Sequence, residues 1–404
     1  QDDQHIMRFL QCLNIQNILN EYVMSETEPE LSELELLYSF IAQRMQYPDQ
    51  DVRRYILIYC LYRHLSELPE GWRNKVSKLH NFYRRSILEP QESAKSISDL
   101  ASFSDSISKT SQEVRAHYEE NPYPRWRGVG APAYSLRPSE VLQGIGLKVP
   151  DILVKSNSEP SILIAGCGTG RTAIESAFRF KNSKILAFDL SYKSLAYAKF
   201  HAARLGAKNI SFIHGDILDL SSLGKTFDII ECTGVLHHMK NPHDGLRNLG
   251  MACKRDGIIK IALYSKIARQ SISKIREKAF STDLDSSASA LRTLRQSIVQ
   301  SSDFESLQAT KFIDFYSLSE FRDLVLHSHE INFDIPQLKM LLEACDLQFA
   351  GFELSKRSRL LAKSVIPEKN LAKLEAWQAV EVSYPSFFSA MYQFWCYKSN
   401  LIDC

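Results

Sequence analysis

The chain has 404 residues, of which 44% are hydrophobic and 24% are charged, so it is long enough for two or three domains and too apolar for a disordered protein. Its 49 Lys and Arg against 47 Asp and Glu give a formal net charge of +2, which lacks the basic excess that favours a phosphate backbone, and nucleic acid is not indicated. The eight cysteines form no C-x-x-C pair, which indicates neither a zinc site nor a disulfide framework and fits a reducing, cytoplasmic protein.

Residues 1–90 form the first predicted segment, a helical region. Apolar residues recur there at helical spacing, as in Ile6, Phe9 and Leu13. The apolar run Tyr55–Tyr62 is far shorter than the roughly twenty residues of a membrane span, so it predicts one buried helix and no membrane span. Ser32 with Glu35 fits a capping box and predicts a helix start. The chain starts at Gln1 instead of Met, which fits a fragment or a processed product.

Composition and periodicity divide the remaining chain. Residues 91–114 are rich in serine and predict a linker with some helix. Strand-like and helix-like runs alternate from Ser161 to about Ser265, which predicts a parallel sheet covered by helices. A helical insertion at about 266–345, with helix from Leu318 to Cys345, precedes two closing strands at 347–354 and 390–397. Trp395 in the last strand is expected in the core. We therefore expect one domain over residues 115–404.

A glycine-rich turn follows the first predicted strand. The apolar run Ile162–Ala165 leads into Gly166, Gly168 and Gly170, and then into a helical pattern. Glycine allows a tight turn and a close approach to a ligand, which the helix N-terminus favours electrostatically. The plain alternative is a tight turn without a ligand. The third glycine comes one residue earlier than in the dinucleotide pattern G-x-G-x-x-G, which favours S-adenosyl-L-methionine over a nicotinamide.

Acidic residues follow the next two predicted strands. Asp189 ends the run that starts at Lys184, and a carboxylate there can accept both hydroxyls of a ribose. Asp216 lies just past the third strand, where it could accept an adenine amino group while Ile217 packs on the ring. The fourth strand, within residues 227–239, should open onto the same crevice.

In this order the motifs of residues 159–265 resemble a class I S-adenosylmethionine-dependent methyltransferase. The resemblance implies a Rossmann-like α/β fold, with a mostly parallel sheet and an antiparallel last strand, and S-adenosyl-L-methionine as cofactor. Ala165 stands where many members carry an acidic residue. The implied cofactor-binding residues are Gly166, Cys167, Gly168, Gly170, Asp189, Leu190, Asp216, Ile217 and Thr233.

The segment Tyr118–Trp126, which contains Asn-Pro-Tyr-Pro-Arg-Trp, resembles the segment before the catalytic core in a bacterial methyltransferase family. That family has an N-terminal helical region, often of tetratricopeptide repeats, whereas residues 1–100 show no repeat here. Residues 315–323 and 391–395 also resemble it. The functional interpretation of the Asn-Pro-Tyr-Pro segment is a lid over the donor, and the structural alternative is a tie between the helices and the sheet.

Methyl transfer is an in-line displacement that needs alignment more than a strong base. For an amine acceptor a nearby tyrosine, histidine or carboxylate would help to remove a proton. We expect Tyr118, Tyr123 and His237 to be catalytic, although His237 could equally be helix-start packing. Further candidates at the crevice are Glu231, His238 and Tyr264.

Two groups of histidines could be functional or purely structural. His237, His238 and His243 share no recognised ligand spacing, so no metal is expected. His327, His329 and Glu330 could face the acceptor or form a solvated helix face.

The predicted function is methyl transfer to a protein or peptide side chain, because a separate helical region could recruit such an acceptor. A quinone-like or phenolic small molecule is the alternative acceptor. A non-catalytic adaptor with a retained methyltransferase fold is a second alternative, and a nicotinamide-dependent oxidoreductase, which the glycine spacing opposes, is a third.

Overall fold

The computed structural model describes residues 2–47, 49–104, 108–120, 122, 124–126, 128–130, 132–147, 159–281, 285–327, 329–388 and 391–399. Contacts between residues divide the chain into two compact units. The helical unit consists of Gln1–Lys95, Pro124–Arg127 and Lys274–Leu326, and the sheet unit of Ser96–Tyr123, Gly128–Ser273 and His327–Cys404. The domain boundaries expected from the sequence stay predictions.

The helical unit has its own apolar core. The run Tyr55–Tyr62 falls largely within one helix, in which Ile56 and Leu57 are fully buried, as predicted. The elements of this unit are α1 (Asp2–Asn20), α2 (Glu28–Arg44), α3 (Arg53–Tyr59), η1 (Leu65–Glu67), α4 (Glu70–Lys75), α5 (His80–Tyr83), the π-helical turn η2 (Arg84–Leu88), α6 (Glu89–Lys95), most of α13 (Gln270–Ser281), α14 (Ala288–Gln300), α15 (Phe304–Ala309), η5 (Ile313–Tyr316) and α16 (Leu318–Leu326).

The predicted helix start at Ser32 is wrong. Thr27 is the N-cap of α2, and its hydroxyl accepts a hydrogen bond from the Glu30 N–H while the Glu30 carboxylate accepts one from the Thr27 N–H. A proline in the first turn of α2 favours this earlier start. Ser32 lies inside the helix and its hydroxyl donates to the Glu28 carbonyl.

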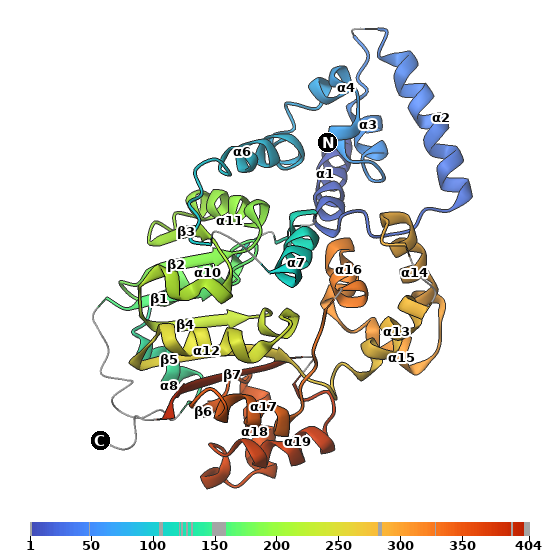
Figure 1. Ribbon diagram of the computed structural model, residues 1–404. Helices are drawn as coiled ribbons and strands as arrows, with labels where there is room; N and C mark the ends of the chain where they lie inside the picture. The colour runs from blue at the N-terminus through green and yellow to red at the C-terminus, as the bar shows by residue number, and fades with distance from the viewer. Residues whose placement is uncertain are drawn as a thin grey trace. The chain divides into compact units, whose positions relative to one another are not determined.

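The sheet unit is built on a seven-stranded sheet with the order β3-β2-β1-β4-β5-β7-β6 (Figure 1). The strands are β1 (Ser161–Ala165), β2 (Lys184–Asp189), β3 (Ile210–His214), β4 (Phe227–Thr233), β5 (Cys253–Tyr264), β6 (Leu347–Phe352) and β7 (Met391–Lys398). Strands β1 to β5 pair in parallel, whereas β7 is antiparallel to both β5 and β6. This is the mostly parallel methyltransferase-like sheet with an antiparallel last strand that the sequence predicted.

Helices precede the first strand of the sheet unit and connect its later strands. They are α7 (Lys109–Glu120), α8 (Pro138–Gly144), α10 (Arg171–Arg179), α11 (Tyr192–Leu205), η3 (Ile217–Leu223), η4 (Leu236–His238), α12 (Pro242–Ala252), α17 (Ile335–Glu343), α18 (Lys356–Val365), η6 (Glu368–Asn370), η7 (Leu374–Ala376) and α19 (Trp377–Ser383). The helix expected from Leu318 to Cys345 is two helices, α16 and α17. Asp334 caps the second one and a proline occupies its first turn, so a new helix starts there.

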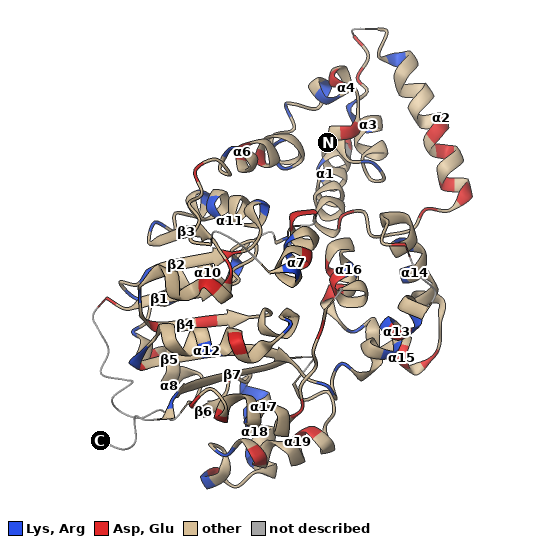
Figure 2. Cartoon of the chain, viewed as in Figure 1, with Lys and Arg blue, Asp and Glu red and all other residues tan. Residues whose placement is uncertain are grey.

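Buried side chains of the central strands form the core of the sheet unit. Trp395 in β7 is fully buried, as predicted, and its indole N–H donates to Glu353, which also pairs with Lys260 at 2.8 Å. The seven described cysteines form no disulfide. Basic and acidic residues are interspersed along most helices, although α2 is mainly acidic (Figure 2). Within the described chain, no helix is both long enough and apolar enough to cross a bilayer.

Candidate functional site

The glycine turn connects β1 to α10 at the carboxyl edge of the parallel strands. Gly166, Gly168 and Gly170 all have positive φ angles, of 69°, 52° and 84°. A Cβ atom on Gly166 would lie 2.2 Å from a methyl carbon of Val235, and one on Gly170 would lie 2.5 Å from the Cβ atom of Ala198. Both the backbone conformation and the packing therefore require glycine. Cys167 is buried between them and its N–H donates to the Phe188 carbonyl.

Asp189 joins this turn to the end of β2. Its Oδ2 atom accepts a hydrogen bond from the Gly168 N–H at 2.7 Å, and Oδ1 accepts one from the Ser191 N–H at 2.9 Å. Burial raises the pKa of the Asp189 carboxyl, and the charge of Glu119 raises it further, while the two N–H donors lower it. Each carboxylate oxygen has a second lone pair, so Asp189 can still accept hydroxyl groups of a ligand.

Asp216 lies beside Asp189 at the same edge, because the Gly215 N–H donates to the Asp189 carbonyl at 3.1 Å. Asp216 caps η3, and its Oδ1 atom accepts from the Leu218 N–H at 3.0 Å. The side chain is only 2% exposed, yet Oδ2 has no hydrogen-bond partner among the described residues. A buried carboxylate oxygen in this state suits a ligand that donates a hydrogen bond, such as an amino group.

The remaining predicted cofactor residues surround this edge. Leu190 is partly buried and its carbonyl contacts the His214 ring nitrogen Nε2 at 3.1 Å. Ile217 belongs to the apolar core and is 4% exposed. The Thr233 hydroxyl, at the end of β4, has no partner within the described chain. The two carboxylates offer acceptors for the ribose hydroxyls and the adenine amino group, and the glycine turn at the start of α10 with the Thr233 hydroxyl offers donors for a charged amino-acid tail, so the residues fit S-adenosyl-L-methionine.

Helix α7 brings Tyr118 to the same edge of the sheet. The Glu119 carboxylate accepts hydrogen bonds from the Tyr192 and Lys193 N–H groups at the start of α11, at 2.6 and 3.3 Å. The Tyr118 carbonyl accepts one from the Ser191 hydroxyl at 3.3 Å. Tyr118, predicted to be catalytic, is therefore held against Ser191, which lies two residues after Asp189 in the chain.

The rest of the Asn-Pro-Tyr-Pro segment divides between the two units. Tyr123, the second tyrosine predicted to be catalytic, and Asn121 lie outside the described residues. Arg125 belongs to the helical unit, where it pairs with Glu21 at 2.7 Å, and Trp126 is buried. The Arg125–Glu21 pair anchors this part of the segment within the helical unit.

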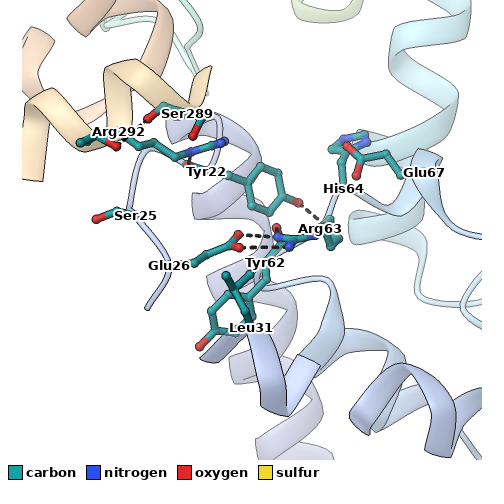
Figure 3. A pocket seen from close by; sticks show the side chains of 11 residues that line it. Tyr22, Ser25, Glu26, Leu31, Tyr62, Arg63, His64, Glu67, Ser289 and Arg292 are labelled. Carbon is teal, nitrogen blue, oxygen red and sulfur yellow. Dashed lines mark hydrogen bonds and ion pairs between the residues drawn. The ribbon is translucent and has the colours of Figure 1, made fainter. Parts of the chain in front are cut away.

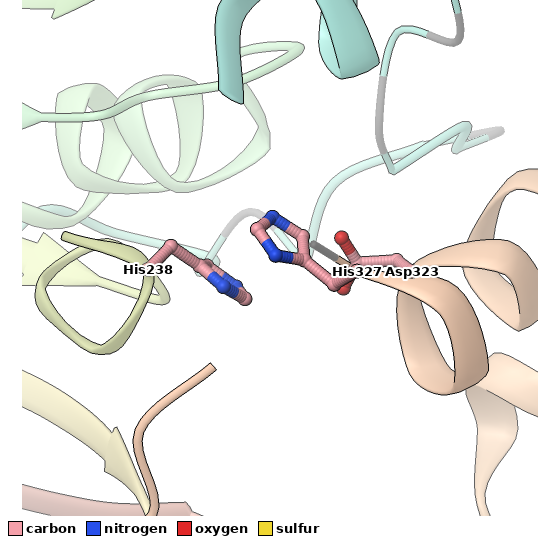
Figure 4. A group of neighbouring side chains, drawn as sticks. All are labelled: His238, Asp323 and His327. Carbon is pink, nitrogen blue, oxygen red and sulfur yellow. The ribbon is translucent and has the colours of Figure 1, made fainter. Parts of the chain in front are cut away.

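An aromatic cluster lies beyond the ends of β4 and β5. The fully buried His237 ring stacks on Tyr264, with ring centres 3.9 Å apart. The His238 ring stacks on His327 at 3.7 Å, and Figure 4 shows these two rings next to each other. The Tyr118 ring lies 6.0 Å from His327. The structure thus brings Tyr118 and His237, far apart in the sequence, into one cluster.

A buried ion pair supports this cluster. The Arg269 guanidinium lies 3.7 Å from the centre of the Tyr264 ring and pairs with Glu330 at 2.8 Å. Both side chains are almost fully buried. Sequence analysis did not single out Arg269, and its only signal was a basic residue shortly after an apolar strand. The solvated helix face considered for His327 and Glu330 is wrong, because both are buried and lie outside helices.

His237 combines burial with unused ring nitrogens. Burial lowers the pKa of His237 well below its ordinary value, and the nearby His238, Arg269 and His327 lower it further. Neither ring nitrogen has a hydrogen-bond partner in the part of the chain that the structure describes. Burial therefore favours the neutral imidazole, which keeps a lone pair on one ring nitrogen that can accept a hydrogen bond.

Two other candidates have structural partners. Glu231 is buried in β4 and accepts hydrogen bonds from Ser176 and Arg179 of α10, at 2.9 and 2.7 Å, so it joins a helix to the sheet. The His243 ring contacts the Ala344 carbonyl at 3.1 Å.

The helical unit contains a pocket of about 390 Å³ that sequence analysis did not predict (Figure 3). Arg63 forms two hydrogen bonds with the Glu26 carboxylate, and Arg292 donates to the Tyr22 carbonyl at 2.6 Å. Glu67 also lines the pocket, so two guanidinium groups face two carboxylates. This balance favours neither an anion nor a cation as ligand.

Comparisons with known proteins agree with this geometry. Residues 156–311 match the family model described as "Methyltransferase domain". An uncharacterised protein of Synechococcus sp. is 28% identical over 304 residues, which is 69% of each chain. The tRNA U34 carboxymethyltransferase of Campylobacter lari is 30% identical over 179 residues, or 39% of this chain and 58% of that protein. The structure of PKMT2 from Rickettsia typhi aligns with 67% of this chain and 55% of its own, with a TM-score of 0.49 and 18% identity. The chain thus spans little more than half the length of the last two.

Proposed function

Since the chain carries a class I S-adenosylmethionine-dependent methyltransferase domain, with S-adenosyl-L-methionine as cofactor and a helical region before it, we propose that it methylates a protein or peptide side chain. The donor supplies an electrophilic methyl carbon on a sulfonium, and the chain's residues bind, orient and shield the reactants. The glycine turn with Asp189 and Asp216 holds the adenosyl end in this proposal. That assignment is supported by their place at one edge of the sheet and by the unused Asp216 oxygen.

The aromatic cluster serves the acceptor in this proposal. A neutral His237 can accept a hydrogen bond from the attacking amine and hold its nitrogen in line with the methyl carbon. The face of the Tyr118 ring favours the positive charge of a sulfonium or an ammonium group. The almost complete burial of His237, Arg269 and Glu330 keeps water away from the attacking atom.

The exposed face of α1 is the reason for proposing a protein as the acceptor. Ile6, Phe9 and Leu13 are 43%, 63% and 37% exposed, and their spacing places them on one side of the helix. A row of exposed apolar side chains on a helix favours contact with another protein. Methylated small molecules need no such surface outside the methyltransferase domain.

Isotope labelling tests the acceptor class. The protein is incubated with cell lysate and a methyl-labelled donor, and mass spectrometry locates the label. We expect label on protein side chains. Phe9→Ser should lower protein labelling at least threefold without changing the Kd for the donor. Met340→Ser, which replaces an equally exposed side chain of α17, should label as the wild type does.

Other outcomes would contradict the proposal. Label confined to small molecules would assign a metabolite acceptor, and label in RNA would assign a nucleic acid. Donor binding without any transfer would favour the non-catalytic adaptor.

A further inference from the structure

The serine-rich stretch before α7 pairs with the edge of the sheet. Strand β3 is an edge strand of the sheet, so one side of its backbone can pair with a further segment. Residues 101–104, called the edge segment below, use that side. The His214 N–H donates to the Ala101 carbonyl at 2.8 Å, and the Phe103 N–H donates to the His214 carbonyl at 3.0 Å. These bonds form a parallel bridge between Ser102 and His214, although the two residues are far apart in the sequence.

Phe103 lies directly against the backbone of Gly215. A Cβ atom on Gly215 would lie 2.1 Å from the Phe103 ring, so only glycine fits there. The same ring meets Phe188 of β2 edge to face at 5.3 Å, and the Phe103 carbonyl accepts a hydrogen bond from the Ser222 hydroxyl at 2.9 Å. Phe103 is thus fixed between the ends of β2 and β3 and the following η3.

Ser104 holds the backbone of Asp216. Its hydroxyl oxygen accepts a hydrogen bond from the Asp216 N–H at 2.7 Å. The Asp216 carboxylate is turned toward η3 by its bond to the Leu218 N–H, which leaves Oδ2 buried and without a partner among the described residues. An unpaired buried carboxylate oxygen costs free energy, and a hydrogen-bond donor on a ligand would recover it.

We propose that the edge segment forms a wall of the purine end of the donor site, with Ser104 as a positioning residue that orients Asp216 toward the exocyclic amino group. This inference rests on the proposed donor site and adds residues that precede the methyltransferase domain. Phe103 supplies apolar contact to either purine, whereas Ser104 acts through Asp216. The two residues therefore differ in what they control: Phe103 affects the affinity for any purine, and Ser104 affects the choice between an amino and a keto group.

Two nucleosides separate these effects. S-adenosylhomocysteine carries the amino group, and S-inosylhomocysteine carries a keto oxygen in its place. Calorimetric titration of the wild type should give at least tenfold tighter binding of the adenosyl compound. Ser104→Ala should reduce that ratio at least threefold, and Ser104→Thr, which keeps the hydroxyl, should restore it. Ser221→Ala, which replaces an exposed serine of η3 outside the edge segment, should keep the wild-type ratio. Phe103→Ala should weaken binding of both compounds by a similar factor of about five.

A second measurement does not depend on the folding of any variant. Saturating the wild type with S-adenosylhomocysteine should slow hydrogen exchange at the amides of residues 101–104 as well as at residues 215–217. Protection of the second group alone would overturn the proposed wall. An unchanged ratio in Ser104→Ala would overturn the positioning role, and tighter binding by Phe103→Ala would show that the segment obstructs the site. A wild type that binds neither nucleoside would contradict the donor site itself.

Discussion

The two halves of the candidate site are held together by different interactions. In the donor half, which comprises the glycine turn, Asp189 and Asp216, side-chain oxygens accept hydrogen bonds from backbone N–H groups at 2.7 to 3.0 Å. In the aromatic half, which comprises Tyr118, His237, His238, Tyr264, Arg269, His327 and Glu330, rings stack on one another and one buried ion pair stands beside them. The donor half therefore depends on backbone geometry, whereas the aromatic half depends on packing and on burial of charge.

Of the changes considered, removing one charge of the buried ion pair in the aromatic half should lower the unfolding free energy most. Glu330→Gln leaves the buried Arg269 guanidinium without its counter-charge, and such a loss costs about 3–5 kcal/mol of unfolding free energy. Denaturant unfolding followed by circular dichroism measures it. The double variant Arg269→Met/Glu330→Leu buries no charge and should recover most of the loss.

A matched surface pair serves as the control. Lys184 pairs with Glu159 at 2.7 Å, but both side chains are largely exposed, so Glu159→Gln should leave the unfolding free energy nearly unchanged. Equal losses in Glu330→Gln and Glu159→Gln would show that the aromatic half does not depend on the buried pair.

The sequence predicts that the residues of the donor half lie at one edge of the sheet, because they follow strand ends in chain order. An apolar run followed by glycine or aspartate marks the end of a buried strand, and parallel strands bring such ends to one edge. Phe103 and Ser104 could not be found in this way. Their stretch is rich in serine and indicates a linker, while the bonds that hold it come from the open backbone of β3, which side-chain composition does not encode.

The aromatic half was only partly predictable for a related reason. His237 and Tyr264 follow strands and were found among the candidates. His327, Glu330 and Arg269 come from the chain between β5 and β6, and their positions depend on how that chain packs. The sequence suggested a solvated face, whereas these polar groups are buried. The burial could not be predicted, because the residues that neutralise and cover them lie far away in the sequence.

Asp189→Ala tests the donor half of the site. Loss of a carboxylate that accepts hydroxyl hydrogen bonds should weaken donor binding by about 1–3 kcal/mol, measured as the Kd by calorimetry. Asp256→Ala, an exposed position in β5, should bind as the wild type does. Because burial raises the pKa of Asp189, wild-type affinity should begin to fall in acid at a higher pH than for an ordinary aspartate. An unchanged Kd would remove the ribose assignment.

The effect of His237→Phe should appear as a pH dependence of the unfolding free energy. Burial lowers the pKa of His237 in the folded protein, so the unfolded chain binds more protons once the pH falls below about 6.5. The wild type should then lose unfolding free energy relative to the variant by up to about 1.4 kcal/mol per pH unit, until the folded-state pKa is reached. Phenylalanine keeps the stacking on Tyr264 and removes the ionisable ring, so the difference between the two unfolding curves isolates His237 from the other histidines. The exposed His80→Phe variant should follow the wild type. His237→Phe could instead keep the acid dependence of the wild type while losing methyl transfer. His237 would then act on the acceptor without being held neutral by burial. That result would contradict the view that the aromatic half depends on desolvation, in contrast to the hydrogen-bonded donor half.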